Sequence, residues 1–205
     1  MNKMNWTDER FKNEILDYKY LIENFKTADV TDRNLYDRSG RNFQRICNDY
    51  FHNALIARKY ADINVLEKHY ELLESYKDSD KTPDFESALR NLFEKTGLVI
   101  PLLASQVAHF FNPDLPIYSG SVLKGLNIDD TAKGIKDPES KINEACKVYN
   151  ALTNSIHEFK DSDTGQEIIK GFKSVFSQYS RIIANITDTK IIDFYFWLPT
   201  LDEEK

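Results

Sequence analysis

Four arginines close together are the clearest group of side chains in this sequence that could bind a charged ligand. They are Arg33, Arg38, Arg41 and Arg45, in a chain whose net charge is −6. Arg41 and Arg45 are four residues apart and would share one face of a helix that starts near Ser39, where free N–H groups attract anions. The segment predicts an anion or phosphate site made by Arg38, Arg41 and Arg45. The alternative is a solvated face on which the arginines pair with Asp32, Asp37 and Asp49.

Other residue types that commonly carry chemistry form no local motif. The four histidines are His52, His69, His109 and His157, and none shows the HxxxH or HExxH spacing of a metal site. We expect each to be a partly exposed helix residue. Cys47 and Cys146 lie far apart and are expected to be reduced and buried. The sequence also lacks a glycine-rich phosphate loop and a GxSxG motif, so we expect no metal, no cofactor and no locally encoded catalytic residue.

The composition indicates a folded helical protein. Hydrophobic residues make up 41% of the chain and charged residues 29%, with only seven glycines and six prolines. An acidic chain is a poor match for a broad nucleic-acid-binding surface, which leaves weak binding through a local basic patch. No stretch approaches the roughly 18 apolar residues of a membrane span. We expect a cytoplasmic protein that does not bind membranes.

The apolar residues recur with helical spacing almost throughout, as in the one-sided stripe that runs from Phe11 to Phe25. The pattern predicts a single all-α domain over residues 1–205, a multi-helix bundle of about eight to ten helices. Residues 77–81 are a candidate junction between two helical subdomains around a cleft. One core is expected to contain Phe110, Phe111, Ile117, Val122, Tyr195 and Trp197.

Capping residues predict where several of these helices begin and end. Thr82 is the expected N-cap of a helix with Pro83 in its first turn, and Gly97 is expected just past its end. Asp137 and Pro138 predict another start. A last helix is expected after Thr187 or Asp188, although residues 191–198 are so uniformly apolar that a buried strand would show the same pattern.

Turn-forming residues concentrate in one place, the segment His109–Leu126, which reads HFFNPDLPIYSGSVLKGL. Asn112 precedes a proline and is therefore pushed out of helical geometry, so the first helix should stop there. Pro116 restricts the linker, and Ser119 or Ser121 can cap the next helix. We expect a sharp reversal between two apolar helices.

This segment resembles the centre of the helix-hairpin-helix DNA glycosylases, the superfamily of the 8-oxoguanine and adenine glycosylases. There a hairpin leads through an apolar helix to a turn that presents a catalytic aspartate. Ile100–Pro101, the run Val107–Phe111 and Pro116–Tyr118 are similar in outline. The chain also resembles a set of uncharacterised bacterial helical proteins with a PIYDSxV-like segment here and a DFYLW-like segment near the C-terminus, where this chain has DFYFWL at 193–198.

The departures from the glycosylase pattern remove its chemistry. Leu102 and Ala104 replace the hairpin glycines that let backbone N–H groups approach a phosphate. Gln106 stands where the lysine nucleophile would be and cannot form a Schiff base. Ser119 stands at the aspartate position and carries no negative charge. The resemblance therefore implies a degenerate glycosylase-like scaffold.

Two functional hypotheses follow from these features. The first is a non-catalytic helical protein that binds a protein partner or a nucleic acid. The second is an enzyme that acts on a nucleotide-like or phosphorylated small molecule in a cleft between subdomains. The sequence favours the first, because no acid, base and nucleophile converge in any local motif.

We predict that the protein does not excise bases from DNA, because Gln106 offers no amine and Ser119 no carboxylate. Incubation with duplexes carrying 8-oxoguanine, uracil or alkylated bases, followed by alkali, should give no strand cleavage. Turnover lost in Gln106→Ala or Ser119→Ala would show that these departures had been misinterpreted. Turnover that survives both changes would mean that a different active site exists.

Overall fold

A computed structural model describes residues 6–31, 38–51, 53, 56, 64–79, 81–177 and 184–198. Within these ranges there are nine helices and no strand, which confirms the predicted all-α class. The helices are α1 (Glu9–Asn24), α2 (Arg38–Tyr50), α4 (Asn64–Lys77), α5 (Phe85–Thr96), α6 (Pro101–Phe111), α7 (Gly120–Gly125), α8 (Pro138–Asp161), α9 (Asp163–Val175) and α11 (Asp188–Trp197).

Most of the predicted helix ends are confirmed. Asp137 caps α8, Thr187 caps α11, and Gly97 ends α5 with a left-handed φ of 69°. Residues 191–197 are helical, which resolves the ambiguity between helix and strand. The prediction for Thr82 is wrong. Asp84 is the N-cap of α5, because its carboxylate accepts a hydrogen bond from the Ser87 N–H at 2.7 Å.

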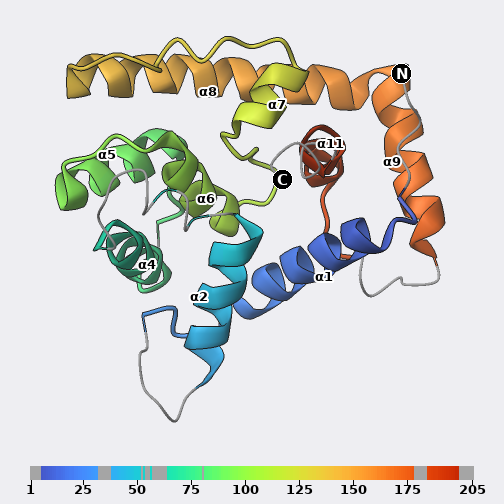
Figure 1. Ribbon diagram of the computed structural model, residues 1–205, viewed down its shortest axis with the longest axis horizontal. Helices are drawn as coiled ribbons and strands as arrows, with labels where there is room; N and C mark the ends of the chain where they lie inside the picture. The colour runs from blue at the N-terminus through green and yellow to red at the C-terminus, as the bar shows by residue number, and fades with distance from the viewer. Residues whose placement is uncertain are drawn as a thin grey trace.

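Helix α6 is buried on every side. Its eight consecutive residues Leu103–Phe110 are all buried, and the helix contacts both α4 and α5. Figure 1 shows α8 along one edge of the molecule and α9 turning away from its end, while α11 is seen end-on in the interior. Helix α11 contacts α7, α8 and α9. The two most enclosed helices, α6 and α11, therefore carry the residues on which the interior is built.

The polar side chains of α6 are hydrogen-bonded within the core. Ser105 donates to the Leu102 carbonyl at 2.8 Å and accepts from the Tyr118 N–H at 2.9 Å. Gln106 and Asn53 exchange two amide hydrogen bonds of 3.1 and 3.0 Å. Since a buried polar group without a partner costs about 1–3 kcal/mol, these bonds specify which segments pack against α6.

His109 links α6 to α1 and to the linker that follows α6. Its Nδ1 lies 2.6 Å from the Leu115 carbonyl, which can only accept, so Nδ1 carries the proton. Its Nε2 lies 2.9 Å from the Tyr18 hydroxyl and is then the acceptor. Burial, and after it the charge of Lys190, lowers the pKa of His109 to about 3, so the ring is neutral.

Buried side chains fix the proline-containing linker predicted between α6 and α7. Besides the His109 contact, the Tyr149 hydroxyl donates to the Pro116 carbonyl at 3.0 Å, and Thr187 Oγ1 donates to the Pro113 carbonyl at 3.0 Å. Ser119, one of the two expected caps, is the N-cap of α7. Side chains of α6, of α8 and of the residue that caps α11 thus donate hydrogen bonds to backbone carbonyls of this turn.

The core is one continuous hydrophobic cluster that includes residues on both sides of the candidate junction at 77–81, such as Leu73 and Leu89. The predicted core residues Phe110 and Val122 are buried within this cluster, whereas Ile117 is buried outside it. Phe111, Tyr195 and Trp197 are only partly buried and pack against the cluster. The two cysteines are free, and Cys47 is buried whereas Cys146 is half-buried, which corrects the expectation for Cys146.

The expectation of partly exposed histidines is wrong for His69 and His109, which are buried. His157 is exposed, and His52 lies outside the described residues. Neither ring nitrogen of His69 has a hydrogen-bond partner in the described part of the chain. Burial lowers the pKa of His69 to about 3. The ring therefore occupies the core as a neutral group.

We predict that His69→Leu raises the free energy of unfolding by an amount that grows as the pH is lowered from about 6.5 to about 3. The unfolded chain binds a proton on His69 below its usual pKa of about 6.5, whereas the folded chain does so only near pH 3. The wild-type protein therefore loses stability as the pH is lowered across this window. Denaturant titrations at several pH values should show a shallower acid loss, and His109 contributes to what remains. His157→Gln is the matched control and should leave the pH profile unchanged; an unaltered profile in His69→Leu would contradict the prediction.

Candidate functional site

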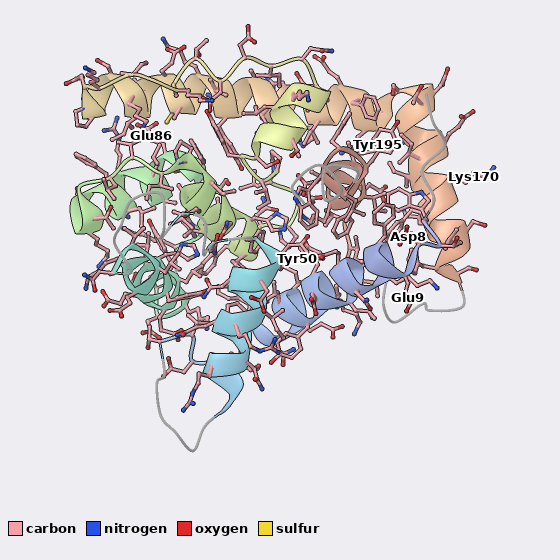
Figure 2. The ribbon with its side chains drawn as sticks, viewed as in Figure 1. Asp8, Glu9, Tyr50, Glu86, Lys170 and Tyr195 are labelled. Atoms are coloured by element: carbon pink, nitrogen blue, oxygen red, sulfur yellow. The ribbon has the colours of Figure 1, made fainter. Side chains whose placement is uncertain are left out.

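A pocket of about 640 Å³ opens between the ends of α2, α6 and α11 and the segment 117–134. This volume is in the range of sites for small molecules. Its walls are mainly apolar, and four of its side chains are aromatic: Tyr50, Phe51, Tyr118 and Trp197. Figure 2 shows Tyr50 at the end of α2, near the centre of the molecule. The Tyr50 and Trp197 rings lie 5.2 Å apart, so α2 and α11 contribute adjacent aromatic surfaces.

A buried ion pair lies in the α11 wall of this pocket. The Lys190 ammonium donates to Asp193 Oδ2 one helical turn away, and the two side chains are only 2% and 5% exposed. Charged groups are buried this fully only when they are paired, because removing a charge from water is costly. The remaining residues of α11 from Ile191 to Phe194 are apolar and buried. The pair is therefore the charged centre of the buried part of α11.

Aromatic rings surround the Lys190 ammonium. Its Nζ lies 4.9 Å from the ring centroids of Tyr18 and Phe194 and 5.5 Å from that of Tyr50. The negative faces of aromatic rings attract a cation, most strongly where water is excluded. These rings come from α1, α2 and α11. Lys190 thus joins three helices at the inner wall of the pocket.

Two polar atoms at this wall have no hydrogen-bond partner in the described part of the chain. They are the Tyr50 hydroxyl and Asp193 Oδ1, and both are buried. Burial, and after it the charge of Asp193, raises the pKa of Tyr50 well above its ordinary value, so the hydroxyl keeps its proton. The wall therefore offers one neutral hydroxyl and one carboxylate oxygen that the protein itself does not use.

The outer part of the pocket is basic. Lys133 and Lys141 line it, and neither ammonium has a carboxylate within ion-pair distance among the described residues. The one acidic side chain here, Asp130, accepts a hydrogen bond of 2.6 Å from the Tyr118 hydroxyl. The charges of Lys190 and Asp193 cancel. The two positive charges of Lys133 and Lys141 then exceed the negative charge of Asp130 by one. This excess favours a ligand that carries an anionic group.

The four positions compared above with the glycosylase pattern have different environments. Ser119 lines the pocket, where its Oγ accepts from the Val122 N–H at 3.2 Å and starts α7. Gln106 is fully buried, is absent from the pocket lining and pairs with Asn53. Leu102 lies inside α6 and lines the pocket, whereas Ala104 is buried in the same helix. Of these positions, Ser119 and Leu102 belong to the site.

The structure does not bring the predicted arginine site to the pocket. Arg41 and Arg45 are exposed, and Arg45 lies 3.5 Å from Asp49 on the same face of α2, which is the pairing weighed as the alternative. Tyr50, the α2 residue in the pocket, is about 14 Å of helix away from Arg41. Arg33 and the side chain of Arg38 lie outside the described residues. Anion binding by these arginines stays a prediction.

The sequence interpretation missed Lys190, Asp193 and Tyr50, the polar residues of the inner wall. A signal for two of them was present, since Lys190 and Asp193 are three residues apart and the other residues from Ile191 to Trp197 are all hydrophobic. Charges at that spacing lie on one face, and an apolar helix has no exposed face on which to place them. Such a pair predicts a buried ion pair. Tyr50 gave no comparable signal, because a single tyrosine on the apolar side of a helix does not indicate a binding site.

We predict a strong coupling between Gln106 and Asn53. Either single change, Gln106→Leu or Asn53→Leu, strands the partner amide in the core and should lower the free energy of unfolding by about 1–3 kcal/mol. The double variant should lose clearly less than the sum, because no amide is then left unpaired. Denaturant unfolding of the four proteins measures this. Additive losses would mean that the two amides do not interact.

Among the described residues, no group of three or more His, Cys, Asp or Glu side chains is placed to hold a metal ion. The same residues contain no helix with the length and apolar character needed to cross a membrane. In comparisons with known proteins, no family model, no curated protein and no solved structure matches this chain.

Proposed function

We propose that the protein is a binding protein for a nucleotide-like ligand, which it holds in the pocket between α2, α6 and α11. The observation that carries this proposal is the combination of an aromatic interior with a basic opening in one pocket of about 640 Å³. A ligand that fits both parts has a flat ring system and an anionic group. A mononucleotide is the simplest biological molecule with this design.

The aromatic interior supports recognition of a ring. Trp197 is half-buried and can stack on a planar ligand, while the buried Tyr50, Tyr118 and Ile117 and the half-buried Leu102 line the same pocket and add apolar contact. Stacking of a base on an aromatic side chain contributes about 1–3 kcal/mol and tolerates any base, because each base has a π face. The ring of the ligand is therefore assigned to the inner half of the pocket.

The basic opening supports recognition of a phosphate. Lys133 and Lys141 approach the pocket from the 126–137 segment and from α8, so two separate elements direct positive charge to its outer half. In a chain with a net charge of −6, an unpaired basic pair beside a pocket acts against the overall field and attracts anions locally. Arg41 and Arg45 of α2 do not line the pocket.

Binding without catalysis is favoured by the state of Lys190, the amine in the inner wall. An ammonium that is ion-paired with Asp193 and enclosed by three rings has no free electron pair with which to attack a ligand. Ser119 lines the same pocket and stands where the resembled glycosylases have their aspartate. That resemblance is a reason to test a nucleotide within a nucleic acid as well as a free one.

We predict that adenosine 5′-monophosphate binds saturably and that Lys133→Ser/Lys141→Ser weakens this binding roughly three- to tenfold, as expected for two partly solvated charge contacts. Isothermal titration calorimetry should show little effect of the double change on adenosine, which lacks the phosphate. Lys95→Ser, which removes an exposed lysine outside the pocket, is the matched control.

Absence of saturable binding by the wild-type protein would refute the proposal. If the double variant lost the same affinity for adenosine as for its monophosphate, the two lysines would not be the phosphate site. Single-stranded and duplex oligonucleotides titrated in parallel distinguish a free nucleotide from one within a nucleic acid. Tighter binding of an oligonucleotide than of the mononucleotide would assign the pocket to a nucleic-acid partner.

A further inference from the structure

Three buried oxygens around α11 have no hydrogen-bond partner in the described part of the chain: Tyr50 Oη, Asp193 Oδ1 and Thr189 Oγ1. Tyr50 and Asp193 line the pocket, and Thr189 does not. Buried polar groups in folded proteins are almost always paired, so each exception calls for a physical explanation. Tyr50 and Asp193 belong to the pocket wall although both oxygens are covered in the free protein, so a ligand that enters the pocket and displaces the covering groups can supply the missing partner.

The other tyrosines near this wall each make a hydrogen bond. Tyr18, in contact with the same Lys190 ammonium, bonds His109 at 2.9 Å, and Tyr149 bonds the Pro116 carbonyl at 3.0 Å. Tyr118, also in the pocket, bonds Asp130 at 2.6 Å. Tyr50 is thus the exception among four neighbouring tyrosines. Its unused hydroxyl lies in the same wall as an unused carboxylate oxygen.

The chemistry of the two groups defines which ligand atoms each can bind by a hydrogen bond. Lys190 occupies one oxygen of the Asp193 carboxylate, and the other can only accept a hydrogen bond. The Tyr50 hydroxyl can donate one. A ligand that satisfies both must carry an N–H donor next to an acceptor on the edge of its ring. A ligand edge with acceptors alone would leave Asp193 Oδ1 buried and unpaired.

We propose that Asp193 and Tyr50 select nucleotides by this edge, binding heterocycles that present an N–H donor beside an acceptor and rejecting those that lack the donor. The inference rests on the proposed nucleotide-binding function and specifies its ligand class. Adenine, with its exocyclic amine beside N1, and hypoxanthine, with N1–H beside a carbonyl, have the required edge. Unsubstituted purine has the ring and the acceptor without the donor.

The first experiment compares ligands on the wild-type protein by calorimetry. Adenosine and inosine 5′-monophosphates should bind about tenfold or more tightly than purine riboside 5′-monophosphate, the ratio expected for one hydrogen bond to a charged acceptor. Equal affinity for all three would refute donor selection while leaving the proposed function intact. Binding of none of them would refute the proposed function, and this inference with it.

The second experiment compares two variants that each remove one unpaired buried hydroxyl. Tyr50→Phe and Thr189→Val should both unfold at a denaturant concentration equal to or above that of the wild type, because neither removes a bond made by the free protein. Only Tyr50→Phe should weaken adenosine monophosphate binding, by roughly tenfold. A loss of stability in Tyr50→Phe with unchanged affinity would show that its hydroxyl has a structural partner instead.

A third variant tests Asp193 without leaving a buried unpaired charge. Asp193→Leu alone strands Lys190, so the double variant Lys190→Met/Asp193→Leu replaces both charges with apolar groups of similar size, and the leucine side chain at position 193 cannot accept a hydrogen bond. This protein should keep its helical circular dichroism and lose the preference for adenosine monophosphate over purine riboside monophosphate. A retained preference would exclude Asp193 as the acceptor.

Discussion

The burial of α6 on every side is the constraint on which the rest of this fold depends. A helix in that position cannot direct a polar side chain to water, so Ser105, Gln106 and His109 each require a partner from another segment. Those partners are the backbone of Tyr118, the amide of Asn53 and the hydroxyl of Tyr18. Apolar packing alone would hold these segments loosely, whereas the hydrogen bonds fix which residue of each segment contacts α6.

The same hydrogen bonds connect the centre of the fold to the pocket. His109 fixes Tyr18 by one ring nitrogen and the linker carbonyl of Leu115 by the other. Tyr18 in turn presents its ring to Lys190, whose partner Asp193 lies in the pocket wall. The linker continues to Ser119 at the pocket edge. The position of the inner wall is therefore set by contacts that begin in α6. In contrast to the paired groups of these contacts, the oxygens Tyr50 Oη and Asp193 Oδ1 are unpaired among the described residues.

The sequence predicted what is local and failed where a property depends on packing. Asp137, Thr187 and Gly97 mark helix ends by their own hydrogen bonds or backbone conformation, and they were predicted correctly. His109 was expected to be partly exposed, because a single histidine cannot show that its helix is enclosed. The pocket joins residues near 50, 100, 118, 133 and 190, and no local pattern brings these together. The arginines of α2 formed the strongest local pattern, and the structure shows Arg41 and Arg45 exposed and outside the pocket lining.

The central claim is that the unpaired groups of the inner wall exist to bind a ligand, while the paired groups of α6 hold the fold. A crystal structure of the protein with adenosine 5′-monophosphate tests it most directly. The account predicts the base within hydrogen-bonding distance of Asp193 Oδ1 and Tyr50 Oη, the phosphate near Lys133 and Lys141, and the Gln106–Asn53 and His109–Tyr18 bonds unchanged. A nucleotide bound outside the pocket, or one in the pocket with its base edge turned away from both oxygens, would contradict it.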